Sequence, residues 1–255
     1  MKLTRLAGTF AAGVTGVQLR PDLDEATVAA IRAAVDEHKV LVFRDQPEIS
    51  SAEFLGVASL FGAPEEEHPT FASPDGVKGV KIVAYDGTLK KDFWHTDGST
   101  RVDCAWLTFL RGMQIPDYGR DTVFCDMEAV YEELSPAMQS CIGNLTAVHA
   151  WGYQDPDAPE VEHPVVRENT RTGRKWLYVN KRFTVGLAGF TEGESKALLD
   201  FLFELVHRPE YQFRLHWTPG TIAVWDNEPT QHYLVHDRVF DRVMHRVMVA
   251  PGQGR

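Results

Sequence analysis

Apolar residues recur at helical spacing in four stretches of this chain. Acidic residues in the first turn of the first stretch mark its start, because they lie at the positive end of a helix dipole. Pro136 interrupts the third stretch, since proline removes a helical hydrogen bond. The predicted helices cover residues 22–38, 51–62, 127–143 and 193–208.

Short β-type runs bounded by turn residues fill much of the remaining chain. Strands are predicted at 40–45, 104–112, 121–126 and 242–250, and further runs read LTAVHAW, HPVVREN, RKWLYVN, FRLHW and TIAVW. The glycine-broken N-terminal segment predicts a first strand and not a signal peptide. Many short strands with a few packing helices favour a mainly β fold, a two-sheet sandwich or jelly roll, over a βαβ array. No repeat or linker is visible, so residues 1–255 are predicted to form one domain.

Composition narrows the range of partners. Of the 255 residues, 44% are hydrophobic and 24% charged, and the net charge is −10. This acidic balance argues against binding to nucleic acid or to an anionic membrane, but it permits a local basic pocket for a small anion. Cys104, Cys125 and Cys141 form no Cys-x-x-Cys pair, which is typical of free thiols in a reducing cytoplasm. We therefore expect a cytoplasmic protein, with homo-oligomer formation left open.

Candidate chemistry begins in the stretch DFWHTDGST, residues 92–100. Alternate side chains of an extended segment share a face, so His95 and Asp97 can bind the same ion. A third ligand is available after the letters WDN, where His232 and His236 both follow. Spacing alone does not choose between these two histidines.

Two histidines and one carboxylate, with three positions open, are the ligand set expected for non-haem Fe(II) that activates oxygen. Zinc is the main rival, although catalytic zinc usually keeps a single open position. A zinc hydrolase and a non-catalytic ligand-binding sandwich are therefore alternatives from other classes.

The last predicted strand carries two arginines. Arg242 and Arg246 are four residues apart, so they share a face with Met244. Facing the interior of a sandwich, two guanidinium groups would each need an anion, and the planar fork of arginine suits a carboxylate or a sulfonate. In the alternative, the opposite face of the strand turns inward and both arginines are in water. The pattern does not decide between the two.

Four motifs occur in order along the chain: WHTD, GRDTVFCDM, WDNEPTQH and RVMHR. In this order they resemble the taurine dioxygenase family of Fe(II)- and 2-oxoglutarate-dependent oxygenases, which includes phenoxyacetate dioxygenases and alkylsulfatases. The resemblance runs from VLVFRDQP near residue 40 to the C-terminus. It implies a double-stranded β-helix core, which is a cupin-like jelly roll, with Fe(II), 2-oxoglutarate and O₂ as cofactors.

The resemblance also implies roles for residues at the iron. His95, Asp97 and His232 match the metal ligands, and the Thr-Gln-His context selects the earlier of the two late histidines. Thr122 matches the threonine that hydrogen-bonds 2-oxoglutarate. Arg242, ten residues after His232, matches the arginine that binds its distal carboxylate.

On the substrate side the match is looser. Arg246 matches the arginine that binds the substrate's anionic group, and His68 and Lys91 lie where two further substrate contacts are expected. Phe71 replaces a tyrosine and Lys91 replaces an asparagine, so a substrate other than taurine is expected. Arg101 replaces an aromatic neighbourhood and is expected to add positive potential at the mouth of the site.

Other departures from the family pattern lie outside these contacts. Glu228 stands where an arginine usually follows WDN, and it is expected to alter a turn. The segment Gly152–Glu162 is shorter than the usual lid, which suggests room for a substrate longer than taurine. His149 and His163 are among the histidines expected to be structural.

We therefore predict an Fe(II)- and 2-oxoglutarate-dependent dioxygenase. It is expected to hydroxylate or otherwise oxidise a small anionic organic molecule, such as a sulfonate, sulfate ester or carboxylate, and to release succinate and CO₂. The alternative within the family is a biosynthetic oxidation, either desaturation or oxidation at nitrogen of an amino-acid-derived carboxylate.

Overall fold

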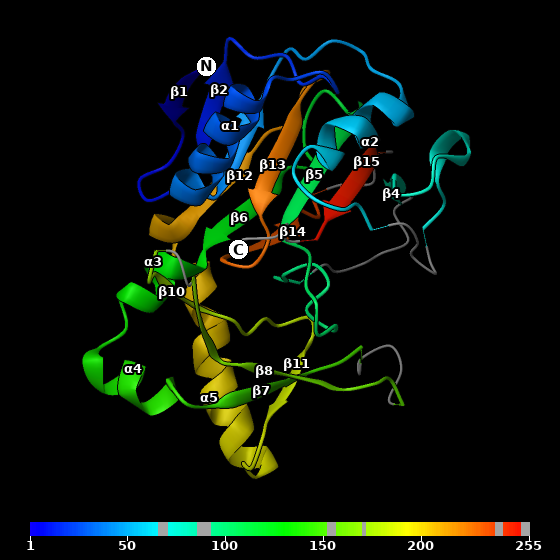
Figure 1. Ribbon diagram of the computed structural model, residues 1–255. Coiled ribbons are helices and arrows are strands. Elements are labelled where there is room, and N and C mark those ends of the chain that lie inside the picture. Colours follow the sequence, from blue (N-terminus) through cyan, green and yellow to red (C-terminus); the bar gives the residue numbers. More distant parts are fainter. Residues whose placement is uncertain (66–70, 86–92, 152–156, 170–171, 238–241, 251–255) are drawn as a thin grey trace.

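Short strands make up most of the regular structure, with helices on their outside (Figure 1). The computed structural model describes residues 1–65, 71–85, 93–151, 157–169, 172–237 and 242–250. The helices are α1 (Glu25–His38), α2 (Ser51–Ser59), α3 (Met127–Glu132), α4 (Pro136–Ile142) and α5 (Glu192–Glu204). The strands of the two main sheets are β1 (Lys2–Arg5), β2 (Ala12–Thr15), β3 (Val40–Phe43), β4 (Lys81–Tyr85), β5 (Leu107–Gln114), β6 (Thr122–Asp126), β12 (Gln212–Leu215), β13 (Ile222–Asp226), β14 (Thr230–Leu234) and β15 (Arg242–Val249).

Two sheets face each other to form the jelly roll. Within the described residues, the larger sheet has the strand order β1-β2-β3-β13-β5-β15-β4, and the smaller has the order β12-β6-β14. Neighbouring strands are antiparallel except for β2 and β3, which run parallel. The predicted mainly β fold with packing helices, a double-stranded β-helix, is thus confirmed.

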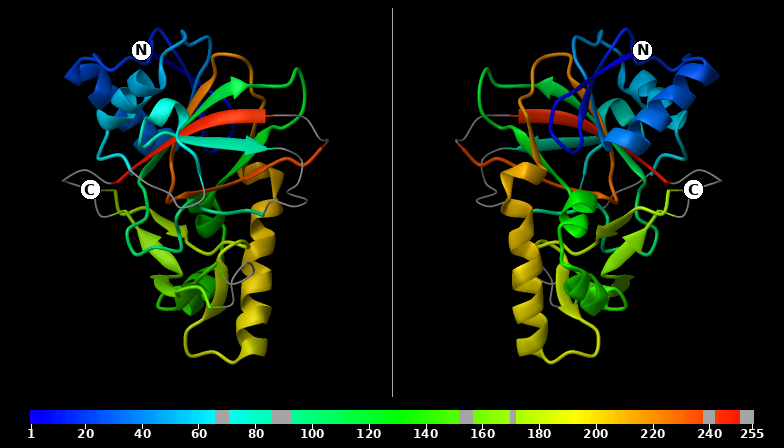
Figure 2. Two further views of the ribbon diagram at one scale, coloured as in Figure 1. Left: turned by 90° about the vertical axis from the view of Figure 1, so that its right-hand side faces the viewer. Right: turned by 90° about the vertical axis from the view of Figure 1, so that its left-hand side faces the viewer.

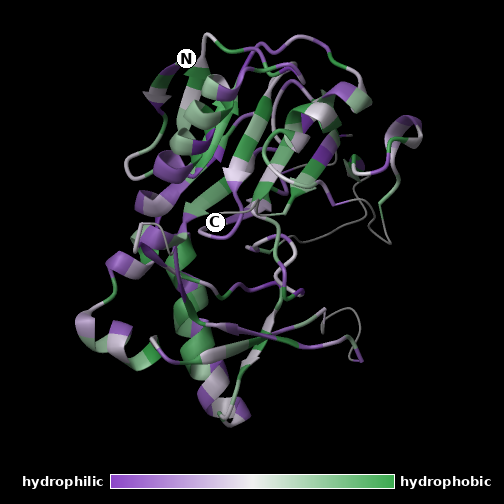
Figure 3. Cartoon of the chain, in the orientation of Figure 1, coloured by the Kyte–Doolittle hydropathy of each residue, from purple (hydrophilic) through white to green (hydrophobic). Residues whose placement is uncertain are grey.

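The two faces of β15 contact different parts of the core. Val247 and Val249 pack in a cluster with the apolar residues of α1 and α2, which cover the outer face of the larger sheet. Met244 instead packs with Phe124 and Trp225, between the two sheets. Strand residues alternate between faces, so the even-numbered positions of β15 point into the jelly roll. Figure 3 shows that the strands of the larger sheet are mostly hydrophobic.

A second apolar cluster lies below the two sheets in Figure 1. The elements in this part of the molecule are α3, α4, α5, β7 (Thr146–His149), β8 (Val161–Pro164), β9 (Val166–Glu168), β10 (Lys175–Leu177) and β11 (Thr184–Leu187). Leu199 and Leu202 of α5 pack here with Trp176 and Val130. Thr191 begins α5 with a capping box in which Glu194 is the reciprocal partner, so this long helix has a fixed start. Figure 2 shows α5 (yellow) running along one side of the molecule.

The structure refines several sequence predictions. The N-terminal segment forms two strands, β1 and β2, where one was expected. The predicted helix 127–143 is two helices, because Ser135 caps a new helix that has Pro136 in its first turn. Strands β4 and β14 were not predicted from the pattern, and both carry residues of the site described below. No helix in the described part of the chain is long and apolar enough to span a bilayer.

His149 makes the fold sensitive to acid. The side chain is fully buried, and burial lowers its pKa to about 3, with a further contribution from His163. An unfolded histidine titrates near 6.5, so below that pH the unfolded chain binds a proton that the folded chain does not. The contribution of His149 to the free energy of unfolding is therefore fully present above about pH 6.5, and it is lost as the pH falls toward 3.

We expect His149→Gln to flatten this dependence, because glutamine does not titrate. Between pH 7.5 and pH 5 the free energy of unfolding of the wild type should fall by about 2 kcal/mol more than that of the variant. Urea unfolding at each pH measures the difference, and His163 remains in both proteins. Parallel pH profiles would contradict the assignment.

Candidate active site

A backbone bridge joins the two parts of the chain that carry the predicted iron ligands. The N–H of His95 donates to the His232 carbonyl (3.1 Å), and the N–H of His232 donates to the His95 carbonyl (2.9 Å). The Thr96 hydroxyl donates to the Thr230 carbonyl at 3.1 Å. Since β14 is also paired with β6, the bridge fixes His95 and its neighbours against the smaller sheet.

The bridge brings His95, Asp97 and His232 together. Nε2 of His95 lies 3.6 Å from Asp97 Oδ1, and Nε2 of His232 lies 3.8 Å from Asp97 Oδ2. One potential ligand atom from each residue lies within 4.8 Å of the others, and all three side chains are buried. Among the described residues these three are the group with metal-binding spacing, and His236 is not part of it.

The protonation of this group suits a divalent cation. Nδ1 of His95 lies 2.8 Å from the Phe93 carbonyl, so a neutral imidazole donates there and leaves Nε2 as the lone-pair atom facing Asp97. Burial acts to raise the pKa of Asp97, but the guanidinium of Arg246, which lies 3.0 Å from Asp97 Oδ2, holds this pKa well below its usual value. The carboxylate is therefore ionised at neutral pH. Two imidazoles and one carboxylate fit Fe(II).

Aromatic side chains enclose the two imidazoles. The His232 ring lies 5.0 Å from Trp225 and 5.9 Å from Phe124, and the His95 ring lies 6.0 Å from Phe183. Such an apolar shell limits water around a metal and strengthens electrostatic interactions there.

Asn227 holds the backbone of Asp97 on both sides. Its Oδ1 accepts from the Asp97 N–H at 3.2 Å, and its Nδ2 donates to the Asp97 carbonyl at 2.7 Å. Two residues further on, the Ser99 carbonyl accepts from His163 Nε2 (2.9 Å), and Ser99 Oγ accepts from Asn180 (3.1 Å). The sequence showed WDN only as a polar turn. Its amide role depends on a contact between distant parts of the chain.

Thr122 and Arg242, the residues predicted to hold 2-oxoglutarate, lie together. Arg242 Nη2 donates to Thr122 Oγ1 at 3.3 Å, and the indole N–H of Trp217 donates to the same oxygen at 3.0 Å. The guanidinium of Arg242 also lies 5.2 Å from the Trp217 ring centre. Trp217 was not among the residues predicted for the site, and the structure adds it to this part of the site.

Arg246 lies on the other side of Met244 along β15. Its Nη1 donates to both oxygens of Asp97, at 3.1 and 3.0 Å, and its guanidinium lies 5.0 Å from the ring centre of Phe71. Its Nε is buried and has no hydrogen-bond acceptor among the described residues. Both arginines therefore share the inner face with Met244, which answers the question that the pattern left open.

A second charged group borders Arg246 and was missed in the sequence. Lys81 is 1% exposed, and its Nζ lies 3.4 Å from Glu65 Oε2. Arg101 donates to the other oxygen of Glu65. Glu65 therefore pairs with both cations, and it offsets the positive potential expected from Arg101 only in part. The signal in the sequence was a lone lysine at the start of an apolar run, VKIVAY.

The remaining predicted residues are only partly placed. His68 and Lys91 lie outside the described residues, as do residues 152–156 of the short segment Gly152–Glu162, so these remain predictions. Glu228 does more than alter a turn, since its carboxylate lies 3.1 Å from Arg167 Nη1. Arg167 in turn covers the ring of Tyr178 at 4.7 Å.

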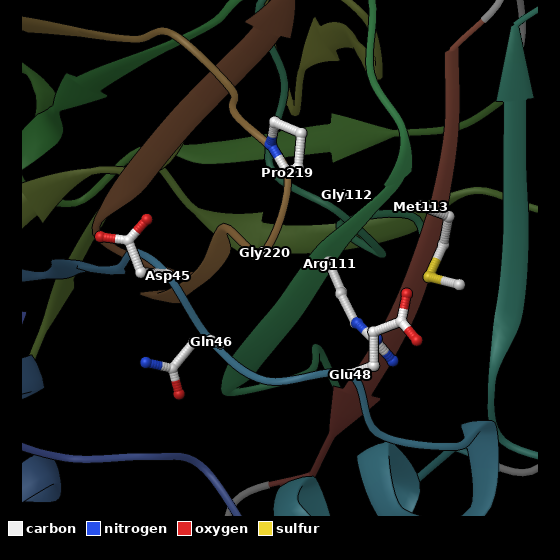
Figure 4. Close-up of a pocket in the computed structure, with 8 residues that line it drawn as sticks. All are labelled: Asp45, Gln46, Glu48, Arg111, Gly112, Met113, Pro219 and Gly220. Atoms are coloured by element: carbon white, nitrogen blue, oxygen red, sulfur yellow. The ribbon is translucent and has the colours of Figure 1, made fainter.

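A surface cavity of about 370 Å³ lies apart from these residues (Figure 4). Its walls include Asp45, Glu48, Arg111 and Gly220, and in Figure 4 the side chains of Arg111 and Glu48 point toward each other. None of the residues predicted for metal, cofactor or substrate lines it. We therefore place the candidate site at the His95–His232 bridge.

Two imidazoles and one carboxylate held in a jelly roll are the metal-ligand set typical of non-haem Fe(II) oxygenases. The model of the taurine catabolism dioxygenase TauD, TfdA family matches residues 2–248. The chain belongs to this family.

Similar proteins extend over nearly the whole chain. An alkylsulfatase of Acinetobacter baylyi is 35% identical, covering 98% of this chain and 85% of its own. An alpha-ketoglutarate-dependent sulfate ester dioxygenase of Pseudomonas putida is 34% identical, covering 96% and 88%. The crystal structure of a taurine dioxygenase from Burkholderia xenovorans superposes with a TM-score of 0.89, with 34% identity and coverage of 98% and 89%.

These findings confirm the predicted enzyme class, a 2-oxoglutarate-dependent non-haem iron dioxygenase, and its cofactors Fe(II), 2-oxoglutarate and O₂. They favour this class over a zinc hydrolase or a non-catalytic sandwich. The role of each residue stays a prediction.

We expect His95→Ala, Asp97→Ala and His232→Ala each to lose Fe(II) binding and Fe(II)-dependent succinate release. Two remaining ligands hold the ion too weakly, and the facial set is broken. His236→Ala is the matched control and should keep most of its activity. Iron analysis after anaerobic reconstitution measures binding directly. An iron-free His236 variant beside an active His232 variant would reverse the assignment.

Arg242→Lys should raise the Michaelis constant for 2-oxoglutarate while leaving that for the prime substrate nearly unchanged. Lysine keeps the charge but loses the two-point fork, a difference of ~1–3 kcal/mol, which corresponds to a change of ~5- to 150-fold. Steady-state kinetics with each substrate varied in turn measures both constants. Equal effects on the two would show that Arg242 does not bind 2-oxoglutarate.

Proposed function

We propose that this enzyme oxidises a small organic anion of the sulfate ester or sulfonate class, using 2-oxoglutarate as cosubstrate. The observation that carries the proposal is the pair of inward arginines on β15, one beside Thr122 and one beside Asp97. Two inward cations at separate positions, Arg242 buried and Arg246 partly buried, fit two separate anionic ligands. The similarity to an alkylsulfatase and a sulfate ester dioxygenase supports the same substrate class.

In this proposal His95, Asp97 and His232 hold the iron. The bound Fe(II), with 2-oxoglutarate and O₂, supplies the oxidising chemistry that yields succinate and CO₂. The chain's own task is to fix these ligands, and it does so through the bridge between His95 and His232 and through the amide of Asn227 on Asp97. Rigid support of this kind keeps metal ligands in their productive geometry.

Arg242 is proposed to bind the distal carboxylate of 2-oxoglutarate, with Thr122 as a second donor. Trp217 covers the guanidinium and donates to Thr122, so it limits the positions that both groups can take. A fixed Arg242 orients the cosubstrate before reaction, which lowers the entropy lost in the reacting complex.

Arg246 is proposed to bind the substrate's anionic group, with Phe71 as an apolar wall. Its Nε supports this role, because it has no acceptor in the described part of the chain, a buried donor without an acceptor is costly, and a ligand oxygen would satisfy it. His68 and Lys91 are proposed as further contacts on the basis of their sequence positions. The free thiols of Cys104, Cys125 and Cys141 support a cytoplasmic location.

A succinate-release screen with Fe(II), 2-oxoglutarate and matched alkyl sulfates, sulfonates, carboxylates, alcohols and amines tests the substrate class. We expect the sulfates or sulfonates to be best, and Arg246→Ala to lose their turnover. Because Arg246 contacts Asp97, the anaerobic metal-to-ligand charge-transfer band serves as the control and should remain in the variant. A neutral or cationic best substrate, or an unaffected Arg246→Ala, would refute the proposal.

A further inference from the structure

Two cations face each other across β4 and β15. Lys81 and Arg246 are directly opposite in the register, and Val83 and Met244 are the next pair on the same face. Because Met244 and Val83 pack between the sheets, Lys81 and Arg246 also point inward. The left view of Figure 2 shows β15 (red) between β4 and β5. Like charges directly opposite each other destabilise a sheet, and burial increases that cost.

The nearby carboxylates offset this charge only in part. In the described part of the chain, Glu65 is the carboxylate within ion-pair distance of Lys81, and the same group is shared with Arg101. Asp97 is the carboxylate that Arg246 contacts. Three cationic side chains thus meet two carboxylates. If Asp97 binds the metal as proposed, its charge is also shared with the ion.

Lys81 and Arg246 also have hydrogen-bond donors that an anionic ligand could use. A lysine ammonium has three N–H donors, and Glu65 accepts from Lys81 at 3.4 Å. Arg246 keeps a buried Nε with no acceptor among the described residues. Burial lowers the pKa of Lys81, and Arg246 and Arg101 add to this effect against the opposing influence of Glu65. An incoming anion would therefore be stabilised by both side chains.

We propose that Lys81 and Arg246 together bind the sulfate or sulfonate group of the substrate, with Glu65 as the counter-charge that competes with the substrate for Lys81. A sulfate ester or a sulfonate has three terminal oxygens, enough for a guanidinium and an ammonium at once, whereas a carboxylate has two. Lys81 thereby selects sulfur oxyanions over carboxylates of equal chain length. The inference rests on the proposed function and narrows its substrate class.

Binding of hexyl sulfate, hexanesulfonate and hexanoate tests this selectivity. Each is titrated anaerobically into enzyme loaded with Fe(II) and 2-oxoglutarate, and the change in the charge-transfer band gives the dissociation constant. Lys81→Met should weaken hexyl sulfate and hexanesulfonate by ~10-fold or more, because a charged hydrogen bond is lost, and hexanoate by less than ~3-fold. The affinity for 2-oxoglutarate should not change.

Lys39→Met is the matched control for loss of a buried lysine. Lys39 is 4% exposed and bound to Glu128 (2.7 Å) and Asp126 (3.4 Å), and it lies outside the proposed site. We expect this variant to lose thermal stability while its dissociation constants stay as in the wild type. If Lys81→Met leaves the ratio of sulfate to carboxylate affinity unchanged, or if Lys39→Met shifts it equally, the role of Lys81 is refuted.

Glu65→Gln provides a second test of the role of Lys81 if Lys81→Met does not fold. Removing the competing carboxylate leaves more of the Lys81 charge to the ligand, so sulfate should bind more tightly, and unchanged or weaker binding would overturn the proposal. The two hypotheses fail separately. If the wild-type enzyme prefers a hexyl alcohol or amine, the proposed function is refuted. If the wild type prefers the sulfate and the ratio of sulfate to carboxylate affinity is the same in Lys81→Met, only the role of Lys81 is refuted.

Discussion

The pair of backbone hydrogen bonds between His95 and His232 is the constraint on which the site depends. It joins a segment just before β5 to a strand of the smaller sheet, and so sets which side chains of each segment meet. Side chains alternate along an extended segment, so a shift of one residue in either partner would turn Thr96 or Gln231 toward the ligand position. The Thr96–Thr230 hydrogen bond and the double contact of Asn227 with Asp97 fix the same register from both sides.

The inward positive charges of β15 are the second constraint, because they lie at two separate positions in the site. Arg242 and Arg246 are four residues apart on β15. They lie on the same face of the strand and are separated along it, with Met244 between them. Each therefore meets a different set of groups, Thr122 and Trp217 in one case and Asp97 and Phe71 in the other. Inward cations are costly unless anions compensate them, and the proposed anionic ligands would supply that compensation.

The charge balance beside Arg246 connects substrate choice with the architecture of the sheet. Lys81 reaches the interior because β4 pairs with residues 242–246 of β15, which places Lys81 opposite Arg246. Glu65 lies in the segment after α2. Its backbone N–H donates to the Met248 carbonyl, so β15 also places Glu65. A single strand thus positions Arg242, Arg246 and the counter-charge of Lys81.

Sequence alone determined the class of fold and nominated residues for the candidate site. Short β-type runs without a βαβ pattern predicted the sandwich. Residue type and spacing suggested His95 and Asp97 as ligands, and the resemblance of the ordered motifs to the family added His232, Thr122 and Arg242. Tertiary structure alone decided which face of β15 turns inward, since both of its faces are covered and the strand pattern is therefore ambiguous. It also revealed Lys81 with Glu65, and Asn227 with Asp97. These pairings join residues far apart in the chain, and no local pattern encodes which distant segments a sheet will bring together.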